Sequence, residues 1–541
     1  MRSFFAPSLL LFSATFASGQ NIVPDAGTEL WADTICFAEG TPPAYKRARE
    51  SALPQVSSFN NFNRWPGTQG SPVTVTWSFV PDGLNIPDGI GEGPGPSTLF
   101  ATLDGAFSNS GGRAVWIERI QQSFDRWEEL SGINFVRRTN GTDEWDDGAL
   151  WDLPGNSVRG DIRIGAKFVD GQSGVLAYAS FPSAGNMVLD MDETWQSGPN
   201  QNRFARNILM HEIGHAIGIA HVCSSNATYL MEPFLTTFID GPHHDDIRAV
   251  QRHYGDLFEN DNNIASANDL GTLPAFLDVG AVPPPVTGAT PTNSSTLSLD
   301  NSFEADWFRF NIAENSEVTI TARPVGMPYD DSDQLSDGSC ASGNQINSRN
   351  IADPSLTLLD STGTITIASS AGGGLGESEQ ISTPLAAGDY AIEIRNDIAS
   401  NVQLYDLEIE STPLATCNTT ASVATRTGGA NLNGLTASRP VLGAQMTFTA
   451  IATYNTGFLL AYGNPGNFTL GNGQILLVEL GPSFLFSMEF QSLPFGSVSI
   501  DVPPDSSLCG FKVYTQALLL GPTQGGPPFQ LTNSQDLTLG S

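Results

Sequence analysis

The sequence predicts a multidomain protein in which an α+β domain is followed by two all-β, sandwich-like domains. Three observations support this fold class. The 541 residues are too many for a single hydrophobic core. Helical periodicity is confined to the chain before about residue 256. Beyond residue 260, short alternating runs separated by turn residues replace it, which is typical of β-sandwiches.

Composition also favours strands and loops, because charged residues make up 15% of the chain while Gly numbers 55 and Pro 35. The 24 Lys and Arg residues against 57 Asp and Glu give a formal net charge of −33. A field of this sign repels phosphate backbones and anionic lipid. We therefore expect neither nucleic acid nor a membrane surface as a partner.

The first 19 residues have the features of a secretory signal peptide. Arg2 precedes an apolar run at residues 4–16, and small residues follow at 17–19. A membrane anchor would need about 20 apolar residues, more than this run provides. We expect cleavage after Gly19, a secreted, extracellular location and no membrane span.

The α+β domain is expected at residues 63–257, after a pro-segment or linker at 20–62 that shows little periodicity. Apolar residues alternate in its predicted strands and recur at steps of three and four in its predicted helices. The strands are expected at 73–79, 161–164 and 175–181, and the helices at 114–130, 202–218 and 245–254. A Gly/Pro-rich loop is expected between the first strand and Gly112.

Alternating runs define the two β domains, expected at 258–412 and at 435–541, with a linker at 413–434. The role of the last domain cannot be read from its sequence. Strands are predicted at 307–312, 318–322, 356–359, 390–394 and 405–409, and then at 445–453, 475–480, 484–490, 498–502 and 511–520.

Residues 211–221 read HEIGHAIGIAH and carry the predicted chemistry. On a helix, His211 and His215 are one turn apart and can bind the same ion. Gly218 can adopt the left-handed conformation that turns the chain back and brings His221 in as a third ligand. All six histidines of the chain lie between residues 211 and 253, so chance is a poor explanation.

Three neutral imidazoles leave the fourth position of Zn²⁺ open to water, as in catalytic zinc sites. Zinc lowers the pKa of bound water, and Glu212 can then accept a proton as that water attacks a carbonyl carbon. A structural zinc is the alternative, but it would not need Glu212.

The motif and its surroundings resemble the metzincin zinc endopeptidases, and within them the matrixins, over about residues 63–256. Met231 in TYLMEPF matches the methionine of the family's Met-turn, and residues 117–135 and 243–255 are similar to its first and closing helices. The resemblance implies a twisted mixed sheet with three helices. It also implies a zinc metalloendopeptidase in which a zinc-bound water, with Glu212 as general base, hydrolyses a protein or peptide substrate. The alternative is a secreted surface- or matrix-binding protein with a vestigial protease domain.

The resemblance further implies positions for the substrate. Leu176 and Ala177 would lie on the edge strand that pairs with an extended peptide. Pro233, Phe234 and Leu235 would form an apolar wall for the residue after the scissile bond, favouring an aliphatic or aromatic side chain there. The nearby His243 and His244 are expected to face solvent at a helix N-terminus.

A calcium site is also implied, before the zinc helix, with oxygen ligands of the kind that suit Ca²⁺. A solvated acidic loop is the alternative. The expected ligands are the carboxylates of Asp170, Asp190 and Glu193 and the backbone carbonyls of Gly171, Ser173 and Val175. The family's second zinc site is expected to be absent, because Tyr178 and Val188 occupy its histidine positions.

Five cysteines remain after the signal peptide, so at least one must be unpaired, and their connectivity cannot be read from the sequence. Cys36 is the only thiol upstream of the α+β domain. The matrixin latency motif PRCGxPD is not found, so Cys36 is either inhibitory or part of a disulfide.

Residues 258–412 resemble the bacterial pre-peptidase C-terminal domain in the segments FENDNNIASANDLG, DWFRFNI and GDYAIEI. That family is a β-sandwich accessory module of secreted peptidases, sometimes removed during maturation. The resemblance indicates no binding residue, and the oligomeric state cannot be read from the sequence.

Overall fold

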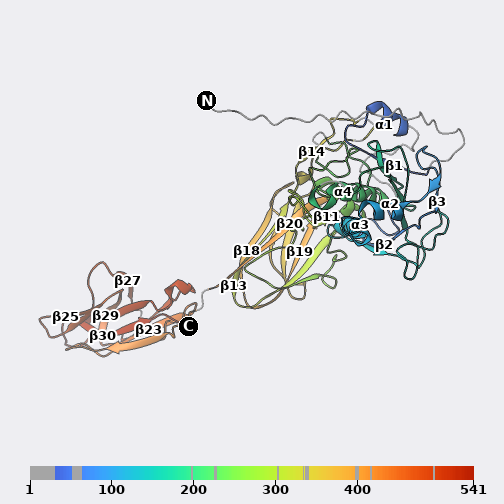
Figure 1. The fold of residues 1–541 in the computed structure, drawn as a ribbon. Helices are drawn as coiled ribbons and strands as arrows, with labels where there is room; N and C mark the ends of the chain where they lie inside the picture. Colours follow the sequence, from blue (N-terminus) through green and yellow to red (C-terminus); the bar gives the residue numbers. More distant parts are fainter. Residues whose placement is uncertain are drawn as a thin grey trace, which may run out of the picture. The chain divides into compact units, whose positions relative to one another are not determined.

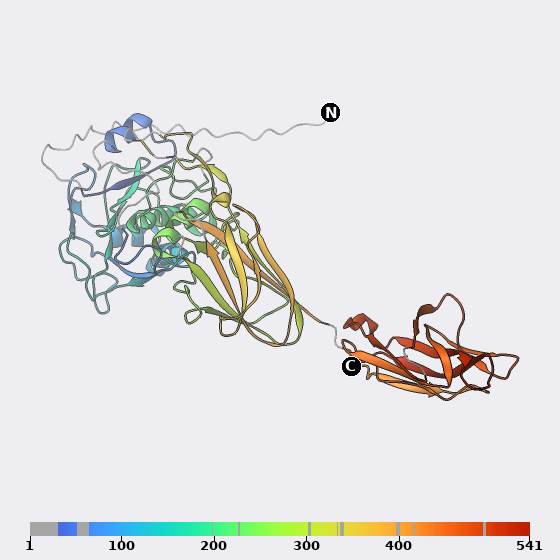
Figure 2. The ribbon, with the colours of Figure 1, turned by 180° about the vertical axis from the view of Figure 1, so that it is seen from behind.

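The structure is a computed structural model that describes residues 31–50, 64–196, 199–224, 228–300, 304–332, 334–335, 340–396, 401–414, 417–490 and 494–541. The predicted signal peptide at 1–19 lies outside these residues. The chain forms two compact units, Met1–Thr412 and Pro413–Ser541 (Figures 1 and 2). Within the described ranges, no helix has the length and apolar character that a membrane crossing requires.

A six-stranded mixed sheet forms the centre of the α+β domain, in the order β1-β7-β8-β6-β2-β5. Strand β2 is parallel to β5 and β6, and β6 is parallel to β8, whereas β7 is antiparallel to both β8 and β1. The predicted mixed sheet is therefore confirmed. The strands are β1 (Thr34–Phe37), β2 (Val73–Phe79), β5 (Ile133–Arg137), β6 (Ile162–Lys167), β7 (Val175–Ala179) and β8 (Met187–Asp190), with a separate pair of β3 (Asn85–Ile86) and β4 (Gly95–Pro96).

Five helices accompany this sheet in the described part of the chain: α1 (Pro43–Glu50), α2 (Leu99–Ala106), α3 (Arg113–Glu128), α4 (Pro199–Ala216) and α5 (His244–Tyr254). The three predicted helices correspond to α3, α4 and α5. Helices α3 and α4 pack against each other (Figure 1), and the Trp127 indole donates a 3.0 Å hydrogen bond to the Met210 carbonyl. The helix that carries His211 and His215 is therefore fixed to the core.

Three local expectations for this domain need correction. Helix α2 replaces part of the expected loop, because Leu99, Phe100 and Leu103 pack into the core. The first helix stops at Glu128 and does not reach residue 135, since the chain turns at Gly132, where a Cβ would lie 2.3 Å from the Tyr254 carbonyl oxygen. The expected pro-segment or linker contains regular structure, because residues 34–37 form β1 and residues 43–50 form α1; both elements are too short to show periodicity.

The first β domain is a sandwich of two sheets ordered β10-β20-β13-β18, with β11 also paired to β20, and β17-β16-β19-β12-β9. All five predicted runs fall on strands, and most of their apolar residues form one buried cluster. A second, smaller cluster contains Trp307, Leu359 and Ala391. Figure 1 shows β14 beside the α+β domain, on the side of α1. The strands are β9 (Asn268–Thr272), β10 (Phe276–Asp278), β11 (Ser298–Leu299), β12 (Ala305–Ile312), β13 (Ser316–Pro324), β16 (Pro354–Asp360), β17 (Thr366–Ser370), β18 (Glu379–Leu385), β19 (Gly388–Asn396) and β20 (Gln403–Pro413), with the hairpin β14 (Pro328–Asp330) and β15 (Gln345–Asn347).

The second unit is all-β, as predicted, with sheets ordered β21-β30-β29-β24-β27, β22-β23-β28 and β25-β26. Strand β21 lies within the range expected to be a linker and pairs with β30; its Ser, Thr and Arg residues conceal the alternation. A disulfide joins Cys417 to Cys509. The strands are β21 (Ser422–Arg426), β22 (Leu435–Ala437), β23 (Gln445–Ile451), β24 (Tyr454–Tyr462), β25 (Pro465–Thr469), β26 (Ile475–Val478), β27 (Phe484–Glu489), β28 (Phe495–Asp501), β29 (Lys512–Pro522) and β30 (Phe529–Thr538).

We expect Asp146→Ala to destabilise the first unit far more than Asp147→Ala. Asp146 pairs with Arg163 at 2.8 Å, and their side chains are 0% and 1% exposed. Removing the carboxylate leaves a buried guanidinium without its counter-charge, at a cost of about 3–5 kcal/mol. Asp147 pairs with Arg159 but is 28% exposed, so its loss should cost about 1 kcal/mol or less.

The measurement is urea unfolding followed by tryptophan fluorescence. All nine tryptophans precede residue 413, so the signal reports on the first unit alone. Equal losses of unfolding free energy in the two variants would contradict the assigned role of the buried pair.

Candidate metal centre

Three histidine side chains converge where α4 ends. His211 and His215 lie on α4, and His221 follows a turn at Gly218, whose φ of 96° is the left-handed conformation predicted for it. The three Nε2 atoms lie 3.0 to 3.1 Å from one another. Nitrogen atoms this close can all reach one ion at the Zn–N distance of about 2.0–2.1 Å.

The second ring nitrogen of each histidine has its own acceptor. Nδ1 of His211 donates to the Leu230 carbonyl, and Nδ1 of His215 donates to the Ile219 carbonyl, both at 2.7 Å. Nδ1 of His221 donates to the side-chain oxygen of Gln334 at 2.5 Å. An oxygen acceptor places the proton on Nδ1, so each Nε2 lone pair faces the common centre.

The environment also keeps the imidazoles neutral. Burial lowers the pKa of His211 to about 3 and that of His221 to about 4, and it lowers the pKa of His215 well below its usual value. Neutral imidazole is the form that binds a metal cation. The chemistry and orientation of the three ligands therefore fit Zn²⁺.

Glu212 lies beside the three histidines and is completely buried. Neither of its carboxylate oxygens has a hydrogen-bond partner among the described residues. Burial raises its pKa well above the usual value. A buried carboxylate without partners is costly unless another group completes its interactions, so the arrangement favours a bound water or substrate group here.

Met231 lies against the zinc helix, as the Met-turn resemblance implies. It is 1% exposed, and a Cβ on Gly214 would lie 2.4 Å from its sulfur. Asp246 at the start of α5 accepts hydrogen bonds from the backbone N–H groups of Leu230 and Met231, at 2.8 and 3.0 Å. Helix α5 thus holds the turn beneath the histidines.

The predicted substrate-binding strand β7 carries Leu176 and Ala177, and β1 covers its free edge. Cys36 of β1 is opposite Ala177 in the antiparallel ladder. The sulfur of Cys36, a ring nitrogen of His211 and a carboxylate oxygen of Glu212 lie within 4.8 Å of one another. Cys36 is buried and unpaired, so the disulfide alternative for it is wrong in this structure.

The opposite wall consists of Pro233, Phe234 and Leu235, and β1 contacts this wall as well. The Leu235 N–H donates to the Phe37 carbonyl at 3.3 Å, and Phe37 forms a parallel bridge with Phe234. The Lys46 ammonium of α1 lies 3.3 Å from the centre of the Phe234 ring. The N-terminal segment therefore fills the space between the two walls predicted to hold substrate.

The expectation that His243 and His244 face solvent is wrong for His244, which is 2% exposed. Its Nε2 lies 2.5 Å from the Ser348 hydroxyl, because residues of the β-sandwich cover the start of α5. His243 caps this helix in a reciprocal arrangement with Asp246.

The predicted calcium ligands come from two segments, the connection from β6 into β7 and the end of β8 with the residues after it. Asp190 accepts hydrogen bonds from the backbone N–H groups of residues 169, 170, 171 and 192, and Glu193 accepts one from Ser173. Asp170 accepts hydrogen bonds from the Val175 N–H and the Tyr45 hydroxyl. Burial, reinforced by the charge of Asp170, raises the pKa of both Asp190 and Glu193 to about 7.

These carboxylates are less tightly grouped than the three histidines. In the described ranges, two groups of three His, Cys, Asp or Glu residues have ligand atoms within 4.8 Å of one another. One is the three histidines, and the other is Cys36, His211 and Glu212. Gly171 and Ser173 precede β7 and Val175 begins it, and the backbone N–H groups of all three donate to carboxylates.

Tyr178 and Val188, which replace the second-zinc histidines, have other contacts. The buried Tyr178 hydroxyl donates to Glu92 at 2.5 Å, and Glu92 forms a 2.6 Å ion pair with Lys167. Val188 packs in an apolar cluster with Trp151.

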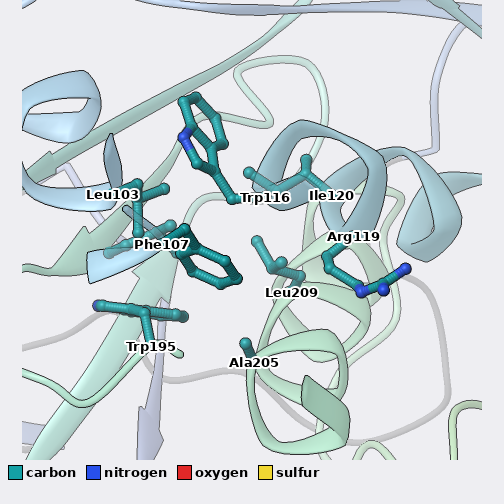
Figure 3. A pocket seen from close by; sticks show the side chains of 9 residues that line it. Leu103, Phe107, Trp116, Arg119, Ile120, Trp195, Ala205 and Leu209 are labelled. Atoms are coloured by element: carbon teal, nitrogen blue, oxygen red, sulfur yellow. The ribbon is translucent and has the colours of Figure 1, made fainter. Parts of the chain in front are cut away.

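A small apolar pocket lies between α2, α3 and α4 (Figure 3). Phe107, Trp116, Leu209 and Trp195 surround it. Its only charged lining residue is Arg119, and the three histidines do not line it. The pocket therefore offers no acid–base or nucleophilic chemistry.

Sequence reasoning missed two parts of the centre, Gln334 and the strand that carries Cys36. Gln334 is 113 residues from His221 and is brought there by the disulfide Cys223–Cys340, which joins residues 117 apart in sequence. Neither spacing forms a recognisable motif. The position of Cys223, two residues after the predicted ligand His221, was the one available signal.

Comparisons with known proteins confirm the two resemblances. Residues 107–255 match the family described as Matrixin, and residues 304–396 match the bacterial pre-peptidase C-terminal domain. Mouse stromelysin-3 is 39% identical over 90 residues, which are 16% of this chain and 18% of that protein. The hatching enzyme of Paracentrotus lividus is 31% identical over 140 residues, 26% of this chain and 22% of its own. Mouse matrix metalloproteinase-19 is 32% identical over 173 residues, 31% of each chain.

The chain thus matches less than a third of the length of these relatives. Among solved structures, the tandem CBM22 domains of Paenibacillus barcinonensis match at 10% identity, over 44% of this chain and 84% of that one. Their TM-score of 0.14 is too low to support any argument.

We expect Gly214→Ala to weaken zinc binding and to destabilise the first unit by about 1–3 kcal/mol, because the new methyl group must displace Met231 in a packed core. Gly105→Ala in α2 is the matched control. A Cβ there meets nothing within 4 Å, so alanine should stabilise that helix by up to about 1 kcal/mol. Zinc competition with a chelator and urea unfolding measure both effects. Identical behaviour of the two variants would contradict the described packing of Met231.

Proposed function

We propose that this protein is a secreted, zinc-dependent endopeptidase. The observation that carries the proposal is the convergence of three oriented, neutral imidazoles beside the buried carboxylate of Glu212. When bound, zinc would supply Lewis acidity that polarises a peptide carbonyl and lowers the pKa of water. The match of residues 107–255 to the matrixins supports the same chemistry.

The protein's own residues then have separate roles. Glu212 accepts a proton from the attacking water and delivers it to the leaving amine. The backbone of Leu176 and Ala177 pairs with an extended peptide, which selects a polypeptide without reading its side chains. Pro233, Phe234 and Leu235 favour an aliphatic or aromatic residue after the scissile bond.

The described conformation supports a latent state of this enzyme. Strand β1 pairs with β7 as an extended peptide would, and its residue Cys36 lies beside His211 and Glu212. A thiolate is a good ligand for zinc, so Cys36 would occupy the position that water needs. Activity therefore requires removal or displacement of residues 31–50.

Calcium is proposed as a second cofactor, at Asp170, Asp190 and Glu193. Burial raises the pKa of Asp190 and Glu193 to about 7, so a bound cation would favour the ionised form of these two carboxyl groups. Tyr45 of α1 now donates a hydrogen bond to Asp170, so departure of the N-terminal segment would also release a calcium-ligating carboxylate.

Export is supported by residues 1–19 and by the disulfides Cys223–Cys340 and Cys417–Cys509, since disulfides persist in oxidising compartments. The alternative, a surface-binding protein with a vestigial protease domain, leaves the buried Glu212 without a role. A non-catalytic domain gains nothing from an uncompensated buried carboxylate.

We expect Glu212→Gln to retain zinc and the fold while hydrolysis of casein falls by about 10²–10⁴-fold, since the proton acceptor is lost. Glu232→Gln is a suitable control, because Glu232 is also buried but contacts Ser224 and Thr228 instead of the histidines. Both variants should be assayed in a form that begins at residue 64. Unchanged hydrolysis by Glu212→Gln would exclude the proposed mechanism.

We expect the intact chain to hydrolyse casein more slowly than a form lacking residues 1–63. Cys36→Ser in the intact chain should give intermediate activity, since it removes the thiol but keeps the strand on β7. Thr34→Ser is a control on the same strand. If the intact and shortened proteins have equal kcat/KM values, the segment is not inhibitory.

Calcium should stabilise the first unit more at pH 8 than at pH 5. The folded-state pKa values of Asp190 and Glu193, raised to about 7 from 3.8 and 4.5, mean that stability without calcium falls as the pH rises from about 4 to about 7. Calcium would bind the ionised carboxylates and so offset the loss of stability at high pH. The thermal midpoint with and without calcium measures the effect.

In the same assay, Glu193→Gln should reduce the shift that calcium causes, whereas Asp192→Asn, at an exposed neighbouring position, should retain it. A calcium shift of the same size in wild type and Glu193→Gln would support a solvated acidic loop instead.

A further inference from the structure

We propose that Gln334 of the β-sandwich is a positioning residue for the zinc ligand His221, so that the sandwich domain is an integral part of the metal centre. The inference rests on the zinc site proposed above. It gives this domain a role that the resemblance to an accessory module, sometimes removed during maturation, does not imply.

The contact itself is direct. Nδ1 of His221 donates a 2.5 Å hydrogen bond to the side-chain oxygen of Gln334. His211 and His215 use carbonyl oxygens of the zinc domain's own backbone for this purpose. His221 is therefore the one ligand of the three whose orientation depends on another domain.

The amide of Gln334 is itself oriented. Its nitrogen donates to the carboxylate of Glu50 at 2.6 Å, which directs the amide oxygen towards His221. An acceptor in this position fixes the imidazole ring, selects the tautomer with a free Nε2 and increases the basicity of that nitrogen. Loss of such a partner typically lowers metal affinity 10–100-fold.

The loop that carries Gln334 is tied to the segment that carries His221. The disulfide Cys223–Cys340 joins them two residues after this ligand. The Cys223 N–H donates to the Ser332 carbonyl at 2.9 Å, and Gln334 forms a β-bridge with Cys340. Covalent and backbone links thus restrict where the Gln334 side chain can lie.

The hairpin of β14 and β15, which flanks this loop, is anchored in the α+β domain. Tyr329 is 4% exposed and belongs to that domain's core, where its hydroxyl donates to Asp245 and accepts from Arg248. The two domains also share one buried apolar cluster, to which the α+β domain contributes Leu130 and Ile247 and the sandwich contributes Val325, Val402 and Leu404. A buried apolar interface of this kind favours a fixed arrangement over a separable module.

The test is zinc affinity, measured by competition with a fluorescent chelator on the full chain. Gln334→Ala should bind zinc 10–100-fold more weakly than wild type and so lose it at a 10–100-fold lower concentration of free chelator. The thermal midpoint of the zinc-free protein should be unchanged. Gln345→Ala, at an exposed position on β15 of the same hairpin, should behave as wild type. In the double variant Gln334→Glu/Glu50→Gln, the carboxylate at position 334 would accept hydrogen bonds from His221 and from the amide at position 50. This variant should restore zinc affinity.

Wild-type zinc affinity in Gln334→Ala would overturn the inference. The inference would also be overturned if the double variant lost as much zinc affinity as Gln334→Ala. An acceptor for His221 would then be present without an effect on zinc binding. A lowered thermal midpoint of zinc-free Gln334→Ala together with weak binding would show a structural role instead. If wild type binds no zinc at all, the proposed function fails, and this outcome is distinct from failure of the Gln334 assignment.

Discussion

The structure around the candidate metal centre depends on one constraint: the Nε2 atoms of three neutral imidazoles, those of His211, His215 and His221, must converge on one position. Each ring is held by a hydrogen bond from Nδ1, and the three acceptors come from different parts of the chain. The Gly218 turn, the support of Leu230 by Asp246 and the disulfide beside His221 all maintain this geometry. Elements far apart in sequence are therefore coupled through one small centre.

The same geometry explains why the N-terminal segment can block the site. Without β1, strand β7 would be an edge strand, and backbone N–H and C=O groups at such an edge can pair with an extended chain. Strand β1 uses this edge and brings Cys36 to the histidines. Inhibition and substrate binding would therefore use one surface, so the two states exclude each other without a large rearrangement of the core.

The sequence predicted the parts of the structure that local rules determine. Helices α3 and α5 follow from apolar periodicity, and the convergence of His211, His215 and His221 follows from their spacing. Short elements such as β1 and α1 carry too few residues to show a period, and their position depends on tertiary pairing. His244 and Gln334 could not be placed, because the contact between the sandwich and α5 is not encoded in any local pattern.

X-ray absorption at the zinc edge tests the central claim most directly, since it reports the ligand atoms of the metal in the purified chain. The account predicts one zinc with three nitrogen ligands and one sulfur ligand in the intact protein. It predicts nitrogen and oxygen ligands alone after residues 1–63 are removed. A chain without zinc, or zinc with no sulfur ligand in the intact protein, would contradict a histidine-bound zinc centre blocked by Cys36.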